Sequence, residues 1–366
     1  MKILQISSAK TFGSWERHFV DLCQGLQNRG HEVFVIIRPT SEWKEQLDFL
    51  PKENVFFFSV RNSFGIFNAQ KIARIIREKG IEIVHAHVTK DYFPSSLACR
   101  VAQKPKFVLT RHSPSPMKSF QRLSLTNLGK AIAISEGIKA DLQRLFTKEK
   151  LALIPNGVET KEVSAEARKK SGEAFRFENN IPFDSLFVGT IGDLKEANGQ
   201  RDFVLAAQIV AERFPDAYFA IIGEDNSTGK PFRRELKRMV KIFGLEKRFL
   251  WLNWVEDKSK FLNALDVFTL SPHERSFALD IIEAMAHQTA IVATQTVSAK
   301  DILQDNETGL IMPIKEPVQL AEAINRLLSD EDLRINLGQK AQINVRENFN
   351  LQRMIEETEK VYQSLL

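Results

Sequence analysis

Short apolar runs, rich in β-branched residues, alternate with amphipathic stretches along most of the chain. Near-continuous apolar character of this kind predicts parallel strands covered on both faces. Between the runs, apolar residues recur at helical spacing, for example over 15–29 and 69–79. Strand–helix alternation predicts an α/β protein with doubly wound sheets. In the first half the runs are 2–7, 32–37, 55–60, 81–87, 107–111, 131–135 and 151–155.

The alternation stops once and then restarts. Residues 159–182 are charged, lack an apolar run and end in a proline. We therefore expect two Rossmann-like domains facing a cleft: 1–160, a linker at 161–182, and 183–350. Residues 351–366 have apolar positions at helical spacing, and we expect them to pack back on the first domain. The second set of runs is 185–190, 217–222, 248–253, 266–270, 290–294 and 309–312.

Composition narrows the class of protein. A hydrophobic fraction of 43% and a charged fraction of 27% are those of a globular protein. No apolar run approaches the roughly 20 residues that span a bilayer. The apolar run in MKILQISSAK, at the start, is too short for the one that a secretory signal would need. Cys23 and Cys99 lie in helix-like apolar surroundings, which indicates reduced core cysteines of a cytoplasmic protein. The net charge of +5 allows anionic ligands or a lipid surface but does not indicate nucleic acid.

Eight stretches, taken in order, resemble glycosyltransferase family 4, whose members are retaining enzymes of the GT-B fold. The resemblance covers essentially the whole chain. It implies a nucleotide-sugar donor in the second domain and a lipid-linked or saccharide acceptor in the first. It implies no metal and no cofactor, because helix N-termini and basic side chains neutralise the diphosphate. The stretches are NRGHEVFVI (28–36), IVHAH (83–87), LTRH (109–112), AIAISEGIKADL (131–142), IPNGVE (154–159), GQRDFVLAA (199–207), IIEAMA (281–286) and NETGLIMP (306–313).

The loop after the first expected strand departs from the family pattern. The family has a glycine pair there, which lets backbone amides approach a ligand. Here Gly13 is followed by Ser14 and Trp15, and an indole fills space that glycine leaves open. The alternative is that Trp15 turns into the domain core. Glu16, Arg17 and His18 follow, and we expect them at the rim of the cleft.

A second departure lies in GDLKEANGQRDF (192–203). The family places an arginine and a lysine here to face the diphosphate, whereas this chain has Asp193 and Asn198 at those places. Lys195 and Arg201 are nearby but displaced. Gly199 still precedes a helix whose N-terminus can attract an anion. The loss of two cationic partners predicts donor binding weaker by about 3–6 kcal/mol.

The stretch SPHERSFALDIIEAMA (271–286) departs from the family as well. Glu283 matches the carboxylate that holds the ribose in relatives, but Arg275 stands where the first family glutamate meets the sugar. Glu274 is one residue out of step, which turns its side chain away in an extended segment. Phe277 is a further candidate contact here, and Ala278 replaces a glycine. In the loop after 290–294, Ser298 replaces a small or acidic residue that faces the diphosphate.

Two further features bear on function. His112, which closes LTRH, matches a family histidine near the donor sugar and is our candidate catalytic residue; the alternative is a histidine that satisfies backbone groups at a strand end. His85 and His87 point the same way along one strand, and without further ligands at metal spacing we interpret them as structural. The basic, apolar-tipped stretch 104–125 suggests peripheral membrane contact, with a solvated loop as the alternative.

These observations leave three hypotheses. The first is a family relative with an eroded donor site that serves as a non-catalytic partner or scaffold beside an active glycosyltransferase. The second is a working retaining transferase, with the donor phosphate held by Lys195, Arg201 or Arg275. The third is a GT-B relative with other chemistry, such as a sugar-nucleotide epimerase. Because the substitutions concentrate in loops that line one expected cleft, the sequence favours the first.

Overall fold

The computed structural model describes residues 1–60, 65–112, 125–160, 163–253, 255, 257–273 and 279–366. The chain forms two compact units. The first comprises Met1–Glu159 together with Phe349–Leu366, and the second is Thr160–Asn348. None of the helices that the structure describes is long and apolar enough to cross a membrane.

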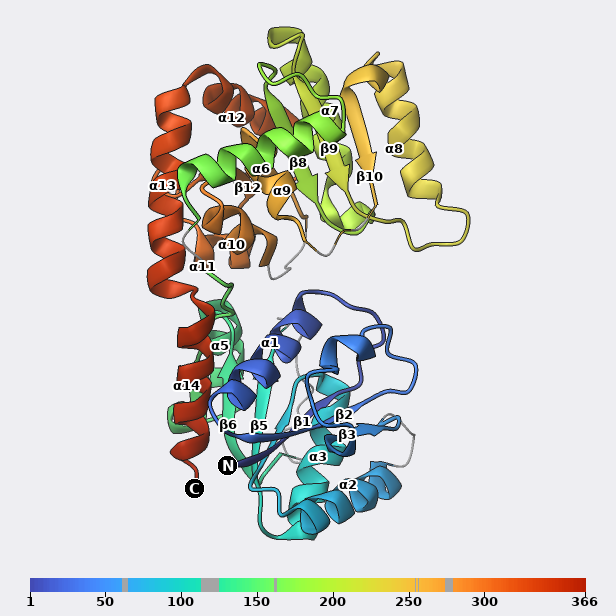
Figure 1. Ribbon diagram of the computed structural model, residues 1–366, viewed down its shortest axis with the longest axis vertical. Coiled ribbons are helices and arrows are strands. Elements are labelled where there is room, and N and C mark those ends of the chain that lie inside the picture. The colour runs from blue at the N-terminus through green and yellow to red at the C-terminus, as the bar shows by residue number, and fades with distance from the viewer. Residues whose placement is uncertain (61–64, 113–124, 161–162, 254, 256, 274–278) are drawn as a thin grey trace. The chain divides into compact units, whose positions relative to one another are not determined.

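The first unit is built on a seven-stranded parallel sheet with the order β3-β2-β1-β4-β5-β6-β7 (Figure 1). Every expected apolar run of this half forms a strand. The strands are β1 (Lys2–Ser7), β2 (Glu32–Ile37), β3 (Val55–Phe57), β4 (Ile83–Ala86), β5 (Lys106–Arg111), β6 (Leu128–Ala133) and β7 (Leu151–Leu153). The helices are α1 (Ser14–Asn28), α2 (Gly65–Lys79), α3 (Thr89–Ala102) and α5 (Glu136–Gln143), with 3-10 turns at Lys44–Leu47, Lys52–Asn54 and Lys148–Lys150.

The last helix, α14 (Leu351–Gln363), belongs to the first unit. It packs against α1, where a Cβ on Gly25 would lie 2.2 Å from Ile355. Its buried face, which includes Met354, Ile355 and Tyr362, joins the core cluster that also contains Phe19. The end of the chain thus completes the core of the domain in which the chain begins.

The second unit repeats the plan with six parallel strands in the order β10-β9-β8-β11-β12-β13. The parallel pairing in both units confirms the predicted doubly wound α/β class. The strands are β8 (Phe187–Ile191), β9 (Tyr218–Ile222), β10 (Phe249–Leu252), β11 (Val267–Leu270), β12 (Ala290–Thr294) and β13 (Leu310–Met312). The helices are α6 (Ala165–Glu178), α7 (Gln200–Arg213), α8 (Pro231–Ile242), α9 (Ser259–Ala264), α10 (Leu279–Ala286), α11 (Val297–Ile302), α12 (Pro317–Ser329) and α13 (Glu331–Asn348), with 3-10 turns at Glu196–Asn198 and Glu246–Arg248.

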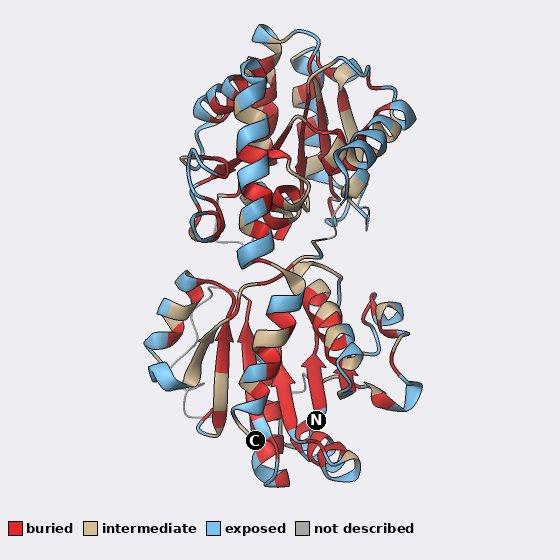
Figure 2. Cartoon of the chain, turned by 60° about the vertical axis from the view of Figure 1, so that its left-hand side comes forward, coloured by how far each residue is buried: buried red, intermediate tan, exposed pale blue. Residues whose placement is uncertain are grey.

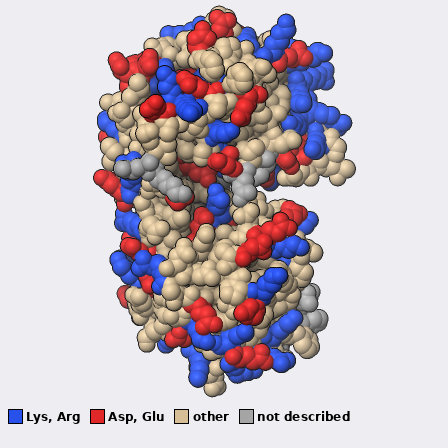
Figure 3. All heavy atoms as spheres, in the orientation of Figure 1, with Lys and Arg blue, Asp and Glu red and all other residues tan. Residues whose placement is uncertain are grey.

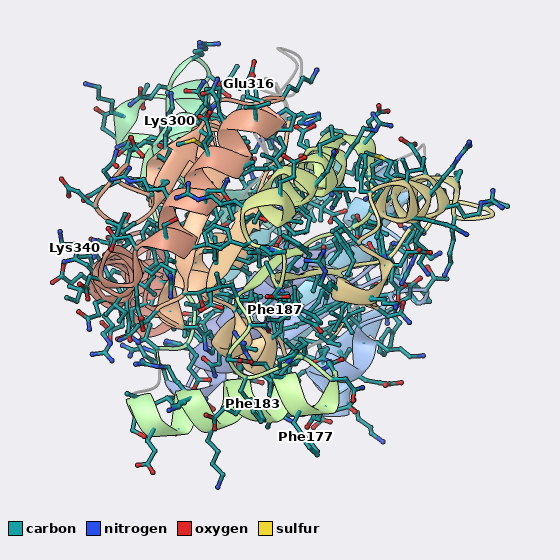
Figure 4. All side chains as sticks on the ribbon, turned by 90° about the horizontal axis from the view of Figure 1, so that it is seen from above. Phe177, Phe183, Phe187, Lys300, Glu316 and Lys340 are labelled. Carbon is teal, nitrogen blue, oxygen red and sulfur yellow. The ribbon has the colours of Figure 1, made fainter. Side chains whose placement is uncertain are left out.

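Helix α6 occupies most of the stretch that the sequence suggested as a linker. It is tied to the second unit by Arg176, whose guanidinium donates to the Ala264 carbonyl at 2.8 Å and pairs with Asp266 at 3.0 Å. Phe175 on α6 contacts the ring of Phe261 with 5.5 Å between centroids. In Figure 4, Phe187 lies inside the unit, whereas Phe177, which belongs to α6, and Phe183 lie at its edge. The charged residues of this stretch form the solvent face of a packed helix.

The strands of both sheets are buried and most of the helices that cover them are exposed on their outer faces (Figure 2). This distribution is expected where apolar strands are covered on both sides. It leaves the loops at the carboxyl ends of the strands as the places where polar side chains can meet a ligand.

Candidate functional site

Each sheet has one point at which the strand order reverses, and ligands of doubly wound sheets bind there, outside the carboxyl ends of the strands. In the first unit this point lies between β1 and β4, and in the second between β8 and β11. Most of the predicted site residues follow these strands or their immediate neighbours. The two switch points therefore define two candidate sites, one in each unit.

In the first unit, Trp15 and His112 lie together. Their rings are nearly parallel, 22° apart, with centroids separated by 5.9 Å. Trp15 comes from the start of α1 and is 38% exposed, so it does not turn into the domain core. His112 directly follows β5 and is buried. A partly exposed aromatic ring therefore lies beside His112, at a position where the family resemblance led us to expect a small residue.

Glu16 is buried and does not form part of a rim. It is the third residue of α1, and its carboxyl group reaches back towards the backbone of Gly13, the residue that caps the helix. Such a capping arrangement normally favours the charged carboxylate. Here burial dominates and raises the pKa of Glu16 to about 7, although the hydrogen bonds from backbone amides act in the opposite direction. Ser14, between Gly13 and Trp15, is half-buried.

His87 orients His112 through a buried polar chain. The Nδ1 atom of His87 lies 3.4 Å from Nε2 of His112, and its Nε2 lies 2.8 Å from Oε1 of Gln5. The Gln5 amide donates to the hydroxyl of Tyr362 at 3.0 Å. Because the amide oxygen can only accept, Nε2 of His87 carries the proton and Nδ1 presents a lone pair. A side chain of the C-terminal helix thus fixes the tautomer of His87.

His85 belongs to the same chain but not to the site. Its Nδ1 contacts the Tyr362 hydroxyl at 2.6 Å, and its Nε2 contacts the Thr110 hydroxyl at 2.7 Å. Both ring nitrogens therefore have partners, which agrees with the structural role inferred from the sequence. Burial lowers the pKa of His85, His87 and His112 well below the usual value, with a further contribution from neighbouring imidazoles. All three rings are neutral at physiological pH.

Several buried polar atoms beside His112 lack a partner among the described residues. They are Nδ1 of His112, both ring nitrogens of His18 and both amide atoms of Asn156. Burial also lowers the pKa of His18 to about 4, although Asn156 beside it acts in the opposite direction. Buried unpaired groups are rare in proteins and often mark a place where a ligand or water binds. Neutral imidazoles and an amide suit uncharged hydroxyl groups better than phosphate.

The same three imidazoles are the natural candidates for a metal site. Among the described residues, potential ligand atoms of His18, His87 and His112 lie within 4.8 Å of one another. Tetrahedral zinc with bonds of about 2.0–2.1 Å needs ligand nitrogens roughly 3.4 Å apart. The cluster as it stands is too open for one ion, so it supports hydrogen bonding better than metal binding.

In the second unit, Gly199 shapes the loop between β8 and α7. Its φ is +73°, and a Cβ there would lie 1.7 Å from the carbonyl oxygen of Ser271. Only glycine allows both the left-handed backbone and this close packing against the end of β11. Gly199 has no side chain to cap α7, which begins directly after it in the loop that follows β8. Asn198, one residue earlier, donates to the Asp193 carbonyl at 2.8 Å.

The displaced cations of this loop are already paired. The ammonium of Lys195 lies 2.7 Å from the Asp193 carboxylate. The guanidinium of Arg201 lies 2.8 Å from Glu196 and 2.7 Å from Glu235. A phosphate would have to compete with these carboxylates for either side chain. Neither side chain is therefore arranged as a dedicated phosphate ligand.

Glu283 lies on α10 and pairs with a lysine that the sequence analysis did not single out. The Lys258 ammonium is 2.8 Å from Glu283 and 2.6 Å from Asp280. Burial lowers the pKa of Lys258, but the two carboxylates outweigh burial, and the pKa is raised overall. Lys258 and Glu283 are 25 residues apart and no local pattern connects them. The contact depends on the three-dimensional position of Lys258, the residue before α9, next to α10, which the sequence alone does not give.

Ser298 is buried in the first turn of α11, beside Thr296, whose hydroxyl caps the helix by accepting from the Ala299 amide at 3.2 Å. Arg275, Phe277 and Ala278 lie outside the described residues. His18, which we expected at the rim of the cleft, is buried instead. Asn156 was not predicted as a site residue, and nothing in its sequence neighbourhood brings it to this place.

Comparison with known proteins identifies the class to which this fold and these sites belong. Residues 171–343 match the family of glycosyl transferases group 1, and residues 15–162 match glycosyltransferase family 4. The chain belongs to this family of glycosyltransferases. It is 25% identical over 341 residues to the lipopolysaccharide core biosynthesis glycosyltransferase LpsE of Rhizobium meliloti, covering 93% of this chain and 92% of that protein.

Solved structures show the same fold. A glycosyltransferase from Rickettsia africae has a TM-score of 0.88 at 22% identity and covers 100% of this chain and 98% of its own. Anabaena HepE in complex with UDP has a TM-score of 0.86 at 19% identity over the full length of both chains. HepE has also been solved with UDP-glucose, with a TM-score of 0.84 at 18% identity over both full lengths. The predicted GT-B fold is confirmed.

Proposed function

We propose that this protein is a working glycosyltransferase that moves a sugar from a nucleotide-sugar donor to a saccharide or lipid-linked acceptor. The second unit binds the donor, the first binds the acceptor, and the sugar keeps its anomeric configuration, as in the family. The LpsE relative points to a glycan of the cell envelope as the product. The buried free thiols of Cys23 and Cys99 support a cytoplasmic location.

The start of α7 is the observation that carries this proposal. Family relatives place the diphosphate beside this loop, and the described loop keeps its backbone: Gly199 is left-handed and packed on Ser271. The helix dipole and the first amides attract an anion without any side chain. Because Asp193 and Asn198 replace two cations, we expect donor affinity lower by two to four decades than with both cations in place.

The first unit supports an acceptor role. Trp15 offers a partly exposed ring, and the neutral groups of His112, His18 and Asn156 offer unpaired hydrogen-bonding atoms beside it. This combination of an aromatic face and polar groups suits a sugar hydroxyl. Because burial holds His112 neutral, we assign it the role of orienting a hydroxyl in the reacting complex, not of neutralising phosphate charge.

A non-catalytic partner of an active glycosyltransferase is the second candidate function. The ion pairs at the start of α7 and in the loop before it support it, because cations that already bind carboxylates are less able to bind a phosphate. These pairs are Lys195 with Asp193, and Arg201 with Glu196 and Glu235. The same sequence departures that predicted an eroded donor site support it too. The comparisons with known glycosyltransferases give more support to activity.

Calorimetric titration with UDP-, GDP- and ADP-sugars, together with an assay for release of the nucleoside diphosphate, tests the proposal. We expect the unaltered protein to bind one donor class and to release its nucleotide when a saccharide acceptor is added. His112→Ala should lower turnover by at least about tenfold and change donor affinity much less, because the proposed diphosphate and ribose contacts come from the second unit.

The matched variant is Asn198→Lys combined with Arg275→Glu, which restores two family residues. Two results together support an active enzyme with a weakened donor site. The unaltered protein turns over a donor, and the double variant binds that donor more tightly. If the unaltered protein neither binds nor turns over any donor and only the double variant binds, the scaffold role replaces the proposed one.

A further inference from the structure

The outer face of α8 is a basic stripe that the candidate sites do not use. Arg234, Lys237, Arg238 and Lys241 are spaced i, i+3, i+4 and i+7, so they lie on one side of the helix. All four are exposed. Figure 3 shows Lys and Arg side chains gathered at the upper right, where Figure 1 places α8.

The opposite face of α8 fixes the stripe in place. Leu236 and Val240 are fully buried in the core of the second unit, and Phe232, Met239 and Phe243 pack against that core. The helix therefore cannot rotate to bury its cations. Its basic side faces solvent over its whole length, about 18 Å for a helix of 12 residues.

The charge of the stripe is not balanced. The one acidic residue between 231 and 242 is Glu235, and its carboxylate is engaged by Arg201 at 2.7 Å. Within the part of the chain that the structure describes, no carboxylate pairs with any of the four stripe cations. Elsewhere on the surface cations are paired, as in Arg74–Glu78 and Lys260–Glu178. Like charges at helical spacing are mildly destabilising, so an anionic partner would relieve a real repulsion.

Both ends of the stripe fit a lipid surface. At the start of α8 a pocket of about 590 Å³ is lined by Lys230, Arg233, Arg234 and Lys237, with Asn253 beside them. The described residues of its lining are cationic or uncharged, which suits a phosphate group. At the other end Ile242 is 69% exposed. An amphipathic helix with a basic face and an exposed apolar residue is typical of contact with anionic lipid headgroups.

We propose that α8 docks this protein on membranes that carry anionic lipid, with the stripe on the headgroups and a lipid phosphate in the pocket. The inference is independent of the proposed transfer reaction, because it uses no residue of either candidate site. This surface is separate from the stretch 104–125, where the expected membrane contact stays a prediction. Within that stretch Arg111 is 3% exposed and donates to the Thr89 hydroxyl, while residues 113–124 lie outside the described residues.

Co-sedimentation with vesicles tests this docking surface. The vesicles are phosphatidylcholine alone, or phosphatidylcholine with a third of the lipid replaced by phosphatidylglycerol. We expect binding to the anionic vesicles only, and loss of binding at high salt. Replacing all four stripe residues with glutamine (Arg234, Lys237, Arg238 and Lys241) should weaken partitioning by on the order of a hundredfold or more. Arg233 is kept because it donates to Asn253.

The control removes the same charge from exposed lysines elsewhere, by glutamine replacement of Lys52, Lys170, Lys300 and Lys340. In Figure 4, Lys300 and Lys340 lie on the side of the unit away from α8. We expect this control to bind within a few-fold of the unaltered protein. Equal loss in both variants, no preference for anionic vesicles, or tighter binding of the stripe to single-stranded DNA than to vesicles would overturn the proposal. Circular dichroism of both variants checks that folding is retained.

Discussion

Glu16 is the single residue whose environment makes the clearest prediction at the residue scale. Burial raises its pKa from 4.5 to about 7, so the folded protein favours the protonated carboxyl group. The unfolded chain loses that proton at lower pH. The contribution of Glu16 to the free energy of unfolding is therefore fully present below about pH 4.5 and is lost as the pH rises through about 7. A shift of this size corresponds to roughly 3 kcal/mol.

Glu16→Gln should remove that loss, because glutamine stays neutral. We expect urea unfolding of the first unit, followed through the buried Trp43, to show the variant more stable than the unaltered protein by up to roughly 3 kcal/mol at pH 8. At pH 4 the two should be nearly equal. Glu166→Gln is the matched control, since Glu166 is also in the first turn of a helix but is exposed. A pH-independent difference for Glu16→Gln would contradict the assignment.

At the scale of elements, the sequence pattern predicts the strands well and their polar contacts poorly. Each of the expected apolar runs forms a strand, since burial on both faces leaves a local apolar signature. Helix α6 was missed because its exposed face is rich in charge and its packing depends on a few residues such as Phe175 and Arg176. The site residues Trp15, Gly199 and Glu283 were visible as family positions. Their contacts could not be predicted: Trp15 meets His112, itself a family position, and Gly199 and Glu283 meet Ser271 and Lys258, all from other elements.

The turn into α7 gives a prediction at this scale. Gly199→Ala must place its Cβ where the Ser271 carbonyl stands and must also adopt a φ of +73°. Left-handed backbone alone costs about 1–2 kcal/mol in a non-glycine residue. We expect the collision to raise the loss to about 3 kcal/mol or more and to abolish donor binding. Urea unfolding of the second unit, followed through Trp251, measures the loss.

Gly244→Ala is the control for this turn. Gly244 also has a left-handed φ, +69°, but no atom lies within 4 Å of a Cβ placed there. It should lose only about 1–2 kcal/mol and keep donor binding. Equal losses in the two variants would mean that the contact with Ser271 does not constrain the loop.

At the scale of the whole molecule, the chain closes its first unit with its last residues. The Val158 amide donates to the Phe349 carbonyl at 2.9 Å, and the Leu351 amide donates to the Val158 carbonyl at 3.0 Å. The contact of Gln5 with Tyr362 joins residues 357 positions apart. Helical spacing in 351–366 can predict a helix with an apolar face. It cannot predict that this face supplies the hydroxyl that orients His87, because that depends on the packed position of one side chain.

Removal of residues 349–366 should therefore unfold the first unit and spare the second. The deletion takes away the buried side chains of Phe349, Met354, Ile355 and Tyr362. Burial of each contributes about 1.5–3 kcal/mol, so the loss is about 6–12 kcal/mol, comparable to the whole stability of a typical domain. Amide hydrogen exchange should show β1, β4 and β5 exchanging freely while β8 and β11 stay protected. Lys360→Ala on the exposed face of α14 should leave both units protected. Protection of β1 in the truncated chain would show that the first sheet holds its core without α14, and His87 would then need another source for its orientation.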